Sequence, residues 1–159
     1  MSPKKSASQE KVEQALVAIN IETEVTVLPD STRTAKEAAQ AVGCQVAQIA
    51  KSIIFMTRDS KLPVLVIASG INRIDEPKIA RLIEEEIVQA KPDFVREKTG
   101  YAIGGVPPLA HNTPLTTIID QDLLQYDRIW AAAGTPKAVF RITPPELVRA
   151  TGGKVAEVK

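Results

Sequence analysis

Apolar positions along the chain follow two spacings, one typical of helices and one of strands. Near the N-terminus they fall three or four residues apart, at Val12, Ala15, Leu16 and Ile19. This spacing places the four side chains on one face of a helix and predicts an amphipathic helix over residues 7–20. Residues 1–6 are polar, and we expect them to form a disordered N-terminal tip.

Two later helices carry start and stop signals in the sequence. Thr34–Glu37 and Thr143–Glu146 each have the form of a capping box, with a glutamate three residues after a threonine. Gly43 and the Gly152-Gly153 pair follow them, and glycine is the residue that most often ends a helix. Each pair of signals predicts a helix in the interval.

Two further helices are predicted between residues 75 and 100. Asp75 can cap a helix, Pro77 suits a first turn, and apolar residues continue at helical spacing to Ile87. The first helix is therefore expected to run to about residue 87. A shorter one is expected over residues 92–98.

Runs of β-branched and apolar residues predict strands. Two of them, "KSIIFMTR" and "LPVLVIAS", flank the polar "DSK", which predicts a β-hairpin. Other strands are expected at "EVTVL", "LTTIID", "RIWAAA", "AVFRI" and "KVAEV", with "QDLLQY" as a helical turn. Because several strands are joined by hairpin-length links, the order favours an α+β protein with a mixed sheet over a doubly wound parallel one.

Length and charge narrow the function classes. A chain of 159 residues that is 44% hydrophobic suits one domain. Lysine and arginine number 20 against 19 aspartates and glutamates. This balance argues against a wide electrostatic grip on nucleic acid, so no DNA partner is expected, while a small contact with one end of an RNA stays open.

Cysteine content and hydropathy indicate the compartment. The single cysteine, Cys44, excludes an internal disulfide, and its apolar neighbours favour a buried inert thiol over a nucleophile. The polar N-terminus lacks an apolar signal core, and no run reaches membrane-spanning length. We expect a cytoplasmic protein without a membrane partner.

Familiar catalytic motifs are absent from the sequence. It has no P-loop, no G-x-G-x-x-G, no G-x-S-x-G and no H-E-x-x-H pattern. The only histidine, His111, lies in the loop "AHNTP", where a surface or turn role is more common than general-base catalysis. A metal site would have to rely on scattered carboxylates. If the protein is an enzyme, it is expected to work without a nucleophile of its own.

Two features remain as candidate chemistry. Lys51 begins "KSIIF", where a lysine is usually a strand-end residue that reaches water, but it also suits a fixed cation at a pocket mouth. The stretch Gly104–Pro108, "GGVPP", is either an ordinary tight turn or a loop whose backbone N–H groups bind an oxyanion or carbonyl. The residues alone leave both pairs of alternatives open.

Four ordered motifs carry a resemblance to a known family. They are "IAKSIIF", "GINRIDEPKIARLI", "GYAIGGVPPLAH" and "AAAGTPKAVFRITPPELVRATGG", and they span roughly residues 24–158. In this order they resemble the YbaK family, which includes the editing domain of bacterial prolyl-tRNA synthetases and its free-standing relatives. The resemblance implies one editing domain over residues 7–159, with an α+β fold built on a curved, barrel-like mixed sheet flanked by helices.

The resemblance also implies an activity and a site. The activity is hydrolysis of the ester between a wrong amino acid and tRNA, with no metal or organic cofactor. Lys51 would hold a phosphate or carbonyl at the acceptor end, and N–H groups around Gly104 and Gly105 would bind the carbonyl oxygen. The substrate-binding residues implied by matching motif positions are Val106, Pro107, Pro108, His111, Asn72, Asp75, Gly134, Thr135 and Pro136.

Substrate and partners stay open at this point. The loop has Val106-Pro107 where the cysteine-removing type resembles "CS", so alanine, serine, threonine, cysteine and small non-protein amino acids are all candidates. The expected partner is the acceptor end of a mischarged tRNA, tRNA(Pro) or a related one, with prolyl-tRNA synthetase or another synthetase as a further candidate. The rival interpretations are a non-catalytic tRNA- or synthetase-binding module of the same fold and a small-molecule esterase.

Overall fold

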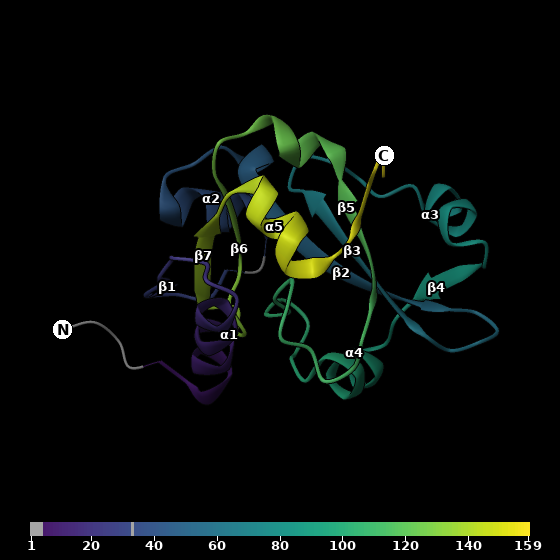
Figure 1. Cartoon of the computed structure of the whole chain (residues 1–159), viewed down its shortest axis with the longest axis horizontal. Coiled ribbons are helices and arrows are strands. Elements are labelled where there is room, and N and C mark those ends of the chain that lie inside the picture. The colour runs from purple at the N-terminus through teal and green to yellow at the C-terminus, as the bar shows by residue number, and fades with distance from the viewer. Residues whose placement is uncertain (1–4, 33) are drawn as a thin grey trace.

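One mixed β-sheet organises the protein (Figure 1). The computed structural model describes residues 5–32 and 34–159, and within them eight strands form this sheet in the order β1-β7-β6-β2-β3-β5-β8, with β4 paired to β2 off this path. The strands are β1 (Val25–Val27), β2 (Ile49–Thr57), β3 (Pro63–Ser69), β4 (Ile87–Gln89), β5 (Thr116–Asp120), β6 (Ile129–Ala132), β7 (Ala138–Ile142) and β8 (Lys154–Ala156).

Strand directions confirm the predicted α+β class with a mixed sheet. The β2–β3 hairpin is antiparallel, as are β1–β7, β6–β7 and β2–β4, whereas β2–β6, β3–β5 and β5–β8 are parallel. The sheet is not closed into a complete barrel, because β1 and β8, at the two ends of the order, do not pair within the described residues.

Five α-helices lie in the described residues, and the ends of α2 and α5 follow the predicted capping signals. They are α1 (Ala7–Ala18), α2 (Ala35–Val42), α3 (Glu76–Ile83), α4 (Pro92–Thr99) and α5 (Pro144–Thr151), with short 3₁₀ turns at Val46–Gln48 and Gln121–Gln125. Thr34 and Thr143 cap α2 and α5, and each accepts a hydrogen bond from the backbone of the expected glutamate. Gly43 and Gly152 end these helices in the left-handed conformation.

One predicted boundary falls elsewhere in the structure. The helix expected to run to residue 87 ends at Ile83, with Glu84 left-handed at a φ of 59°. Three successive glutamates follow it, and the N–H of Arg58 donates to the carbonyl of Glu86 at 2.8 Å. Ile87 therefore enters β4 beside β2 rather than extending the helix.

The expected N-terminal tip lies mostly outside the described residues. Of residues 1–6, positions 1–4 are not described, and Ser6 is the N-cap of α1, where it forms a capping box with Gln9. None of the helices in the described part of the chain is both long and apolar enough to cross a membrane.

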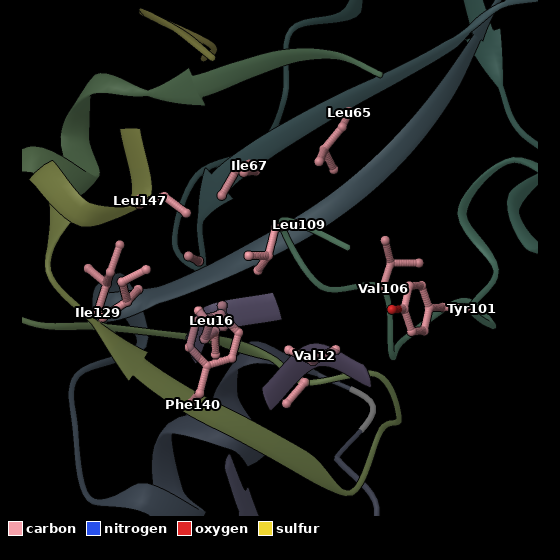
Figure 2. Close-up of a cluster of buried hydrophobic side chains, with 14 of the residues drawn as sticks. Val12, Leu16, Leu65, Ile67, Tyr101, Val106, Leu109, Ile129, Phe140 and Leu147 are labelled. Atoms are coloured by element: carbon pink, nitrogen blue, oxygen red, sulfur yellow. The ribbon is translucent and has the colours of Figure 1, made fainter. Parts of the chain in front are cut away.

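Apolar side chains pack on both faces of the central strands. On one face, Leu65 and Ile67 of β3 join a cluster that includes Leu16 of α1, Phe140 of β7 and Leu147 of α5 (Figure 2). The other face of β3 forms a second cluster with Phe55 and with Ile79 of α3. Because successive strand residues alternate between faces, β3 is fully buried along its length.

The expectation of a buried Cys44 is wrong. Its side chain is only partly buried, because it follows the left-handed Gly43 in the loop that leaves α2. The thiol donates to the carbonyl of Gln45 at 3.3 Å. Partial burial raises the pKa of the Cys44 thiol, which keeps it in the less reactive protonated form.

Candidate functional site

The edge of β2 that faces away from β3 is open at its centre. Along this edge the pairing with β6 ends at Ala50, and the pairing with β4 begins at Phe55. Residues 51–54 therefore have no strand partner on this side among the residues that the structure describes. A gap in a sheet edge leaves main-chain hydrogen-bonding groups available to a ligand.

The direction of neighbouring hydrogen bonds identifies which groups face the gap. The Ile49 carbonyl accepts from the N–H of Gly70, and the N–H of Thr57 donates to Leu62, both on the β3 side. Successive residues of a strand point these groups to alternate sides. The N–H and C=O groups of Ser52 and Ile54 are thus directed toward the open edge.

A tight turn lies across this gap. The N–H of Gly105 donates to the carbonyl of Ala102 at 3.0 Å, which closes a β-turn with Ile103 and Gly104 at its tip. Gly104 has a φ of 91° at the third position of the turn, where a type II turn requires glycine. Ile103, at the second position, is 55% exposed.

The strand edge and the turn enclose a groove with two lobes. Their volumes are about 530 and 580 Å³. Residues common to both lobes are Lys51, Ser52, Ile53, Gly70, Ile103, Gly104 and Val106. The first lobe continues toward Asn72 and Arg73, and the second continues toward α2 and Trp130. We call this space the β2-edge groove.

Lys51 brings a cation to the centre of the β2-edge groove. It is the third residue of β2 and is partly buried. Burial lowers the pKa of the Lys51 ammonium, while the negative charge of Asp120 acts to raise it. Within the described residues, the other charged residues that line the groove are Arg73 and Glu76 in the first lobe and Lys36 in the second.

The structure separates the roles of Asn72 and Asp75. Asn72 lines the first lobe, is 6% exposed, and donates through Nδ2 to Asp120 and to Asp122, each at 2.8 Å. Asp75 is not among the lining residues of either lobe. It caps α3 by accepting from the N–H of Lys78 at 3.2 Å.

The loop 133–136 supports the turn at Gly104 from behind. The N–H of Gly134 donates to the carbonyl of Gly105 at 3.0 Å. A Cβ on Gly105 would lie 2.6 Å from the Cα of Thr135, so glycine is required there by close packing. Thr135 lines the second lobe and accepts at Oγ1 from Nε2 of Gln9 at 2.7 Å. Pro136 lies behind Gly104, 3.5 Å from where a Cβ on that residue would be.

Gly105 does not offer the free donor that its motif suggested. Its N–H is already bonded to Ala102, and the residue is buried. Of the two glycines predicted to bind a carbonyl oxygen, only Gly104 lines the β2-edge groove.

The far end of the same loop lies outside the groove. His111 donates through Nε2 to the carbonyl of Pro107 at 2.6 Å, and burial lowers the pKa of its imidazole. Pro108 and His111 line a separate cavity of about 400 Å³, and Pro107 lines neither lobe. These three residues therefore hold the loop in shape from outside the β2-edge groove.

Tyr101 and Val106 anchor the loop in the core (Figure 2). The Tyr101 hydroxyl donates to the carbonyl of Ala110 at 2.8 Å, and burial raises the pKa of Tyr101 to about 12. The hydroxyl thus stays protonated and remains a donor. Val106 is 3% exposed, although it also lines both lobes.

Ser52 and Gly70 line the groove and lie within two of the family motifs, but the sequence does not single them out as site residues. Ser52 follows Lys51, and its Oγ is buried without a hydrogen-bond partner in the described part of the chain. Gly70 lines both lobes, and a Cβ on it would lie 2.4 Å from the carbonyl oxygen of Val46. Asp120, which bonds to Asn72 from outside the groove, is marked in the sequence only as the acidic residue that closes the apolar run "LTTIID".

No metal-binding set is formed by the residues that the structure describes. Within 5–32 and 34–159, histidine, cysteine, aspartate and glutamate side chains do not gather in a group of three that could hold a metal ion. The described residues give the β2-edge groove the ammonium group of Lys51, main-chain donors and acceptors, apolar walls, and further charged and polar side chains toward the far ends of its two lobes.

Fold and groove together define a class of protein, an α+β domain with a lysine-lined groove at an open sheet edge. The chain belongs to the aminoacyl-tRNA editing domain family, whose family model matches residues 29–150. The resemblance to the YbaK family seen in the sequence motifs is thereby confirmed.

Individual relatives agree with this assignment. The chain is 50% identical to a crystal structure of a protein proposed as a trans-editing enzyme for prolyl tRNA synthetase, with a TM-score of 0.93 over 98% of this chain and 99% of that one. It is 31% identical over 138 residues to the uncharacterized protein YwhH of Bacillus subtilis, covering 86% of each chain. It is also 29% identical over 94 residues to the proline--tRNA ligase of Limosilactobacillus fermentum, matching 57% of this chain but 16% of the ligase.

Proposed function

We propose that the protein is a trans-editing aminoacyl-tRNA deacylase. Its substrate would be a tRNA that carries a small wrong amino acid, and this tRNA would be tRNA(Pro) or a related one. Its products would be the free amino acid and the tRNA. The observation that carries this proposal is the position of Lys51 in a groove where main-chain groups of β2 face an open edge. The editing family and the similarity to a ligase for proline support the substrate class.

The proposed chemistry needs no protein nucleophile. Water attacks the ester carbonyl and gives up a proton, the carbonyl oxygen becomes negative in the tetrahedral intermediate, and the C–O bond to the ribose then breaks as the carbonyl re-forms. The departing ribose oxygen takes up a proton, and its neighbouring hydroxyl can order the water. The protein contributes by positioning the ester and stabilising the negative oxygen.

Three kinds of groups in the groove are suited to those tasks. The Lys51 ammonium would hold the carbonyl or the terminal phosphate of the acceptor end. N–H groups of Ser52, Ile54 and Gly104 are the candidate donors to the oxygen, in place of Gly105, whose N–H is already bonded. Val106 would limit the volume of the aminoacyl side chain, since a single methylene changes discrimination by about 1–3 kcal/mol.

The test is a deacylation assay with purified protein and mischarged tRNA. Lys51→Met keeps the length and apolar stem of the side chain but removes the charge, so the rate should fall at least about tenfold while the melting temperature stays close to the wild-type value. Lys154→Met, at an exposed lysine of β8, is the matched control and should keep full activity. Equal rates for Lys51→Met and wild type would contradict the role given to Lys51.

The rival is a non-catalytic module that binds an acceptor end or a synthetase. Such a module would leave the ester at its uncatalysed half-life in the same assay, even if it bound the tRNA. A small-molecule esterase with an unrecognised nucleophile would be labelled by an active-site serine probe, and we expect no labelling.

The proposed activity implies that the protein works in the cytoplasm, where tRNA is charged.

A further inference from the structure

Lys51 shares one face of the sheet with a buried carboxylate. On β2 and β3, Lys51 is paired directly with Ala68. On β3 and β5, the parallel register pairs Ile67 with Ile119, so the next residues along, Ala68 and Asp120, also lie side by side. Paired residues project to the same face of a sheet. Lys51, Ala68 and Asp120 therefore form a row across three neighbouring strands.

The middle position of this row is occupied by a small side chain. Two strand spacings separate the Cα atoms of Lys51 and Asp120 by roughly 10 Å, and a lysine side chain can cross much of that distance. Ala68 is completely buried and contributes only a methyl group between the two charged residues. A charge pair across one strand is thus compatible with the packing.

Asp120 also organises the turn that follows β3. It is 1% exposed. Its Oδ2 accepts from the N–H of Ser69 at 3.0 Å and from Nδ2 of Asn72 at 2.8 Å, while its Oδ1 accepts from the N–H of Asp122 at 2.9 Å. Gly70 and Asn72, which line the β2-edge groove, lie in the segment held by these bonds.

We propose that Asp120 is a positioning residue of the β2-edge groove. Its carboxylate is the counter-charge of Lys51 across Ala68, and its hydrogen bonds to Ser69 and Asn72 fix the turn that lines the groove beside this lysine. Asp120 does not line either lobe, so it acts through Lys51 and Asn72 and not on the substrate. The effect of Asp120 on catalysis rests on the proposed function. Its charge interaction with Lys51 does not.

The other charges around Lys51 do not replace this role. Arg73 and Lys36 carry the same sign as Lys51, so neither can be its counter-charge. Among the described residues Glu76 is the carboxylate that lines the groove itself, and it lies partly buried in the first turn of α3. Asp120 is the carboxylate whose charge raises the pKa of Lys51 against the larger, lowering effect of burial.

The direct experiment is an NMR titration of Lys51 with ¹³C-labelled lysine side chains. Asp120→Asn removes the negative charge with little change in volume and should move the Lys51 titration to lower pH. Asp122→Asn is the matched control, because it removes a neighbouring carboxylate that also accepts from Asn72, and it should leave the Lys51 titration in place. A Lys51 titration that is the same in folded Asp120→Asn and in wild type would overturn the proposal.

A second measurement does not need the Asp120 variant to fold. The free energy of unfolding is compared between wild type and Lys51→Met at neutral pH and at a pH where carboxyl groups are protonated. The attraction exists only while the carboxylate is charged, so the advantage of wild type should be larger at neutral pH. The same comparison is made in a Glu76→Gln background, so that the Glu76 carboxylate cannot be the source of a pH-dependent difference. If the difference in the free energy of unfolding between the proteins with and without Lys51→Met does not depend on pH in this background, the charge pair is overturned.

The deacylation rate separates this proposal from the proposed function. In Asp120→Asn, the loss of activity at alkaline pH should begin at lower pH than in wild type, which a purely structural role would not cause. If wild type proves inactive but the Lys51 titration moves as expected, the charge pair stands and the proposed function fails. If wild type is active and the titration does not move, the proposed function stands and the role of Asp120 fails.

Discussion

Among individual residues, the proposed chemistry depends most on the ammonium group of Lys51. Burial lowers its pKa below that of an ordinary lysine. A lysine is charged below its pKa and neutral above it, so its contribution is present at neutral pH and is lost as the pH rises through the lowered value. Enzyme-catalysed deacylation, after subtraction of the spontaneous rate, should therefore decline at lower pH than the titration of an exposed lysine.

A matched variant checks the origin of this decline. The planar guanidinium of arginine stays charged throughout the accessible range. Any activity that Lys51→Arg retains should show no alkaline loss. A decline at the same pH in Lys51→Arg and wild type would mean that another group controls the profile.

The two neighbouring glycines of the groove turn should behave differently when each is replaced by alanine. A Cβ on Gly105 would lie 2.6 Å from the backbone of Thr135, so Gly105→Ala should lower stability first and activity only as a result. A Cβ on Gly104 has an ordinary 3.5 Å contact with Pro136, and its left-handed φ costs an alanine about 1–2 kcal/mol.

Thermal unfolding and deacylation rates measured on both variants test this difference. Gly104→Ala should lose more activity than its modest loss of stability explains, because it alters the groove surface. Equal losses of stability in the two variants, with activity following stability in both, would show that the turn has only a structural role.

At the scale of elements, α1 stabilises the wall of the second lobe. Gln9 is 4% exposed and donates to Thr135, and a Cβ on Gly134 would lie 2.7 Å from the carbonyl oxygen of Ser8. Gln9→Ala removes the hydrogen bond that reaches the lobe and should reduce both activity and stability, the latter by about 1–2 kcal/mol. Chemical denaturation and deacylation rates measure the two effects.

Thr143→Ala provides the comparison for this prediction. It removes the cap of α5, which does not line the β2-edge groove, and should cost about 1 kcal/mol of stability. Its activity at a temperature well below unfolding should equal that of wild type. The same activity in Gln9→Ala and Thr143→Ala would argue against a role for α1 in the groove.

Local signals in the sequence were sufficient for most elements. The caps at Thr34 and Thr143 and the hairpin around residues 58–62 depend on neighbouring residues, and the structure confirms them. The helical spacing of apolar residues predicts that Ile87 belongs to a helix, yet pairing with β2, a long-range contact, places it in a strand. Long-range pairing of this kind is not visible in a single local pattern.

Only part of the candidate site could be predicted from the sequence, again because long-range strand pairing is not visible in a local pattern. Lys51 and Gly104 carried motif signals, and both line the groove. The open edge of β2 exists because β6 and β4, from distant parts of the chain, pair with its two ends. The row from Lys51 to Asp120 follows from the register of three strands. Neither arrangement can be inferred without the sheet order.

At the scale of the whole molecule, charge limits how the protein can hold tRNA. With 20 basic against 19 acidic residues, and Lys36, Lys51 and Arg73 as the basic groove residues in the described part of the chain, we expect about three phosphate contacts. The plot of log affinity against log salt should then have a slope of roughly −2 for a single-stranded acceptor end. Binding measured across a salt series would contradict this if it were tight and had a much steeper slope.

The expected weak binding of tRNA has a consequence for selectivity. A domain with few phosphate contacts gains little from the body of the tRNA, so selection of the tRNA would depend on another protein. Prolyl-tRNA synthetase or another synthetase is the proposed partner, in keeping with the similarity to the proline--tRNA ligase. Adding the cognate synthetase should then increase selectivity among tRNAs.

The most direct test of the proposed function is hydrolysis of a panel of mischarged tRNAs by the purified wild-type protein. The panel carries alanine, serine, threonine, cysteine and small non-protein amino acids on tRNA(Pro), with correctly charged prolyl-tRNA as the reference. We predict that at least one small aminoacyl ester is hydrolysed far faster than without protein, that prolyl-tRNA is spared, and that Lys51→Met loses this activity. Uncatalysed half-lives for the whole panel, with the partner synthetase present as well as absent, would contradict the assignment as a deacylase.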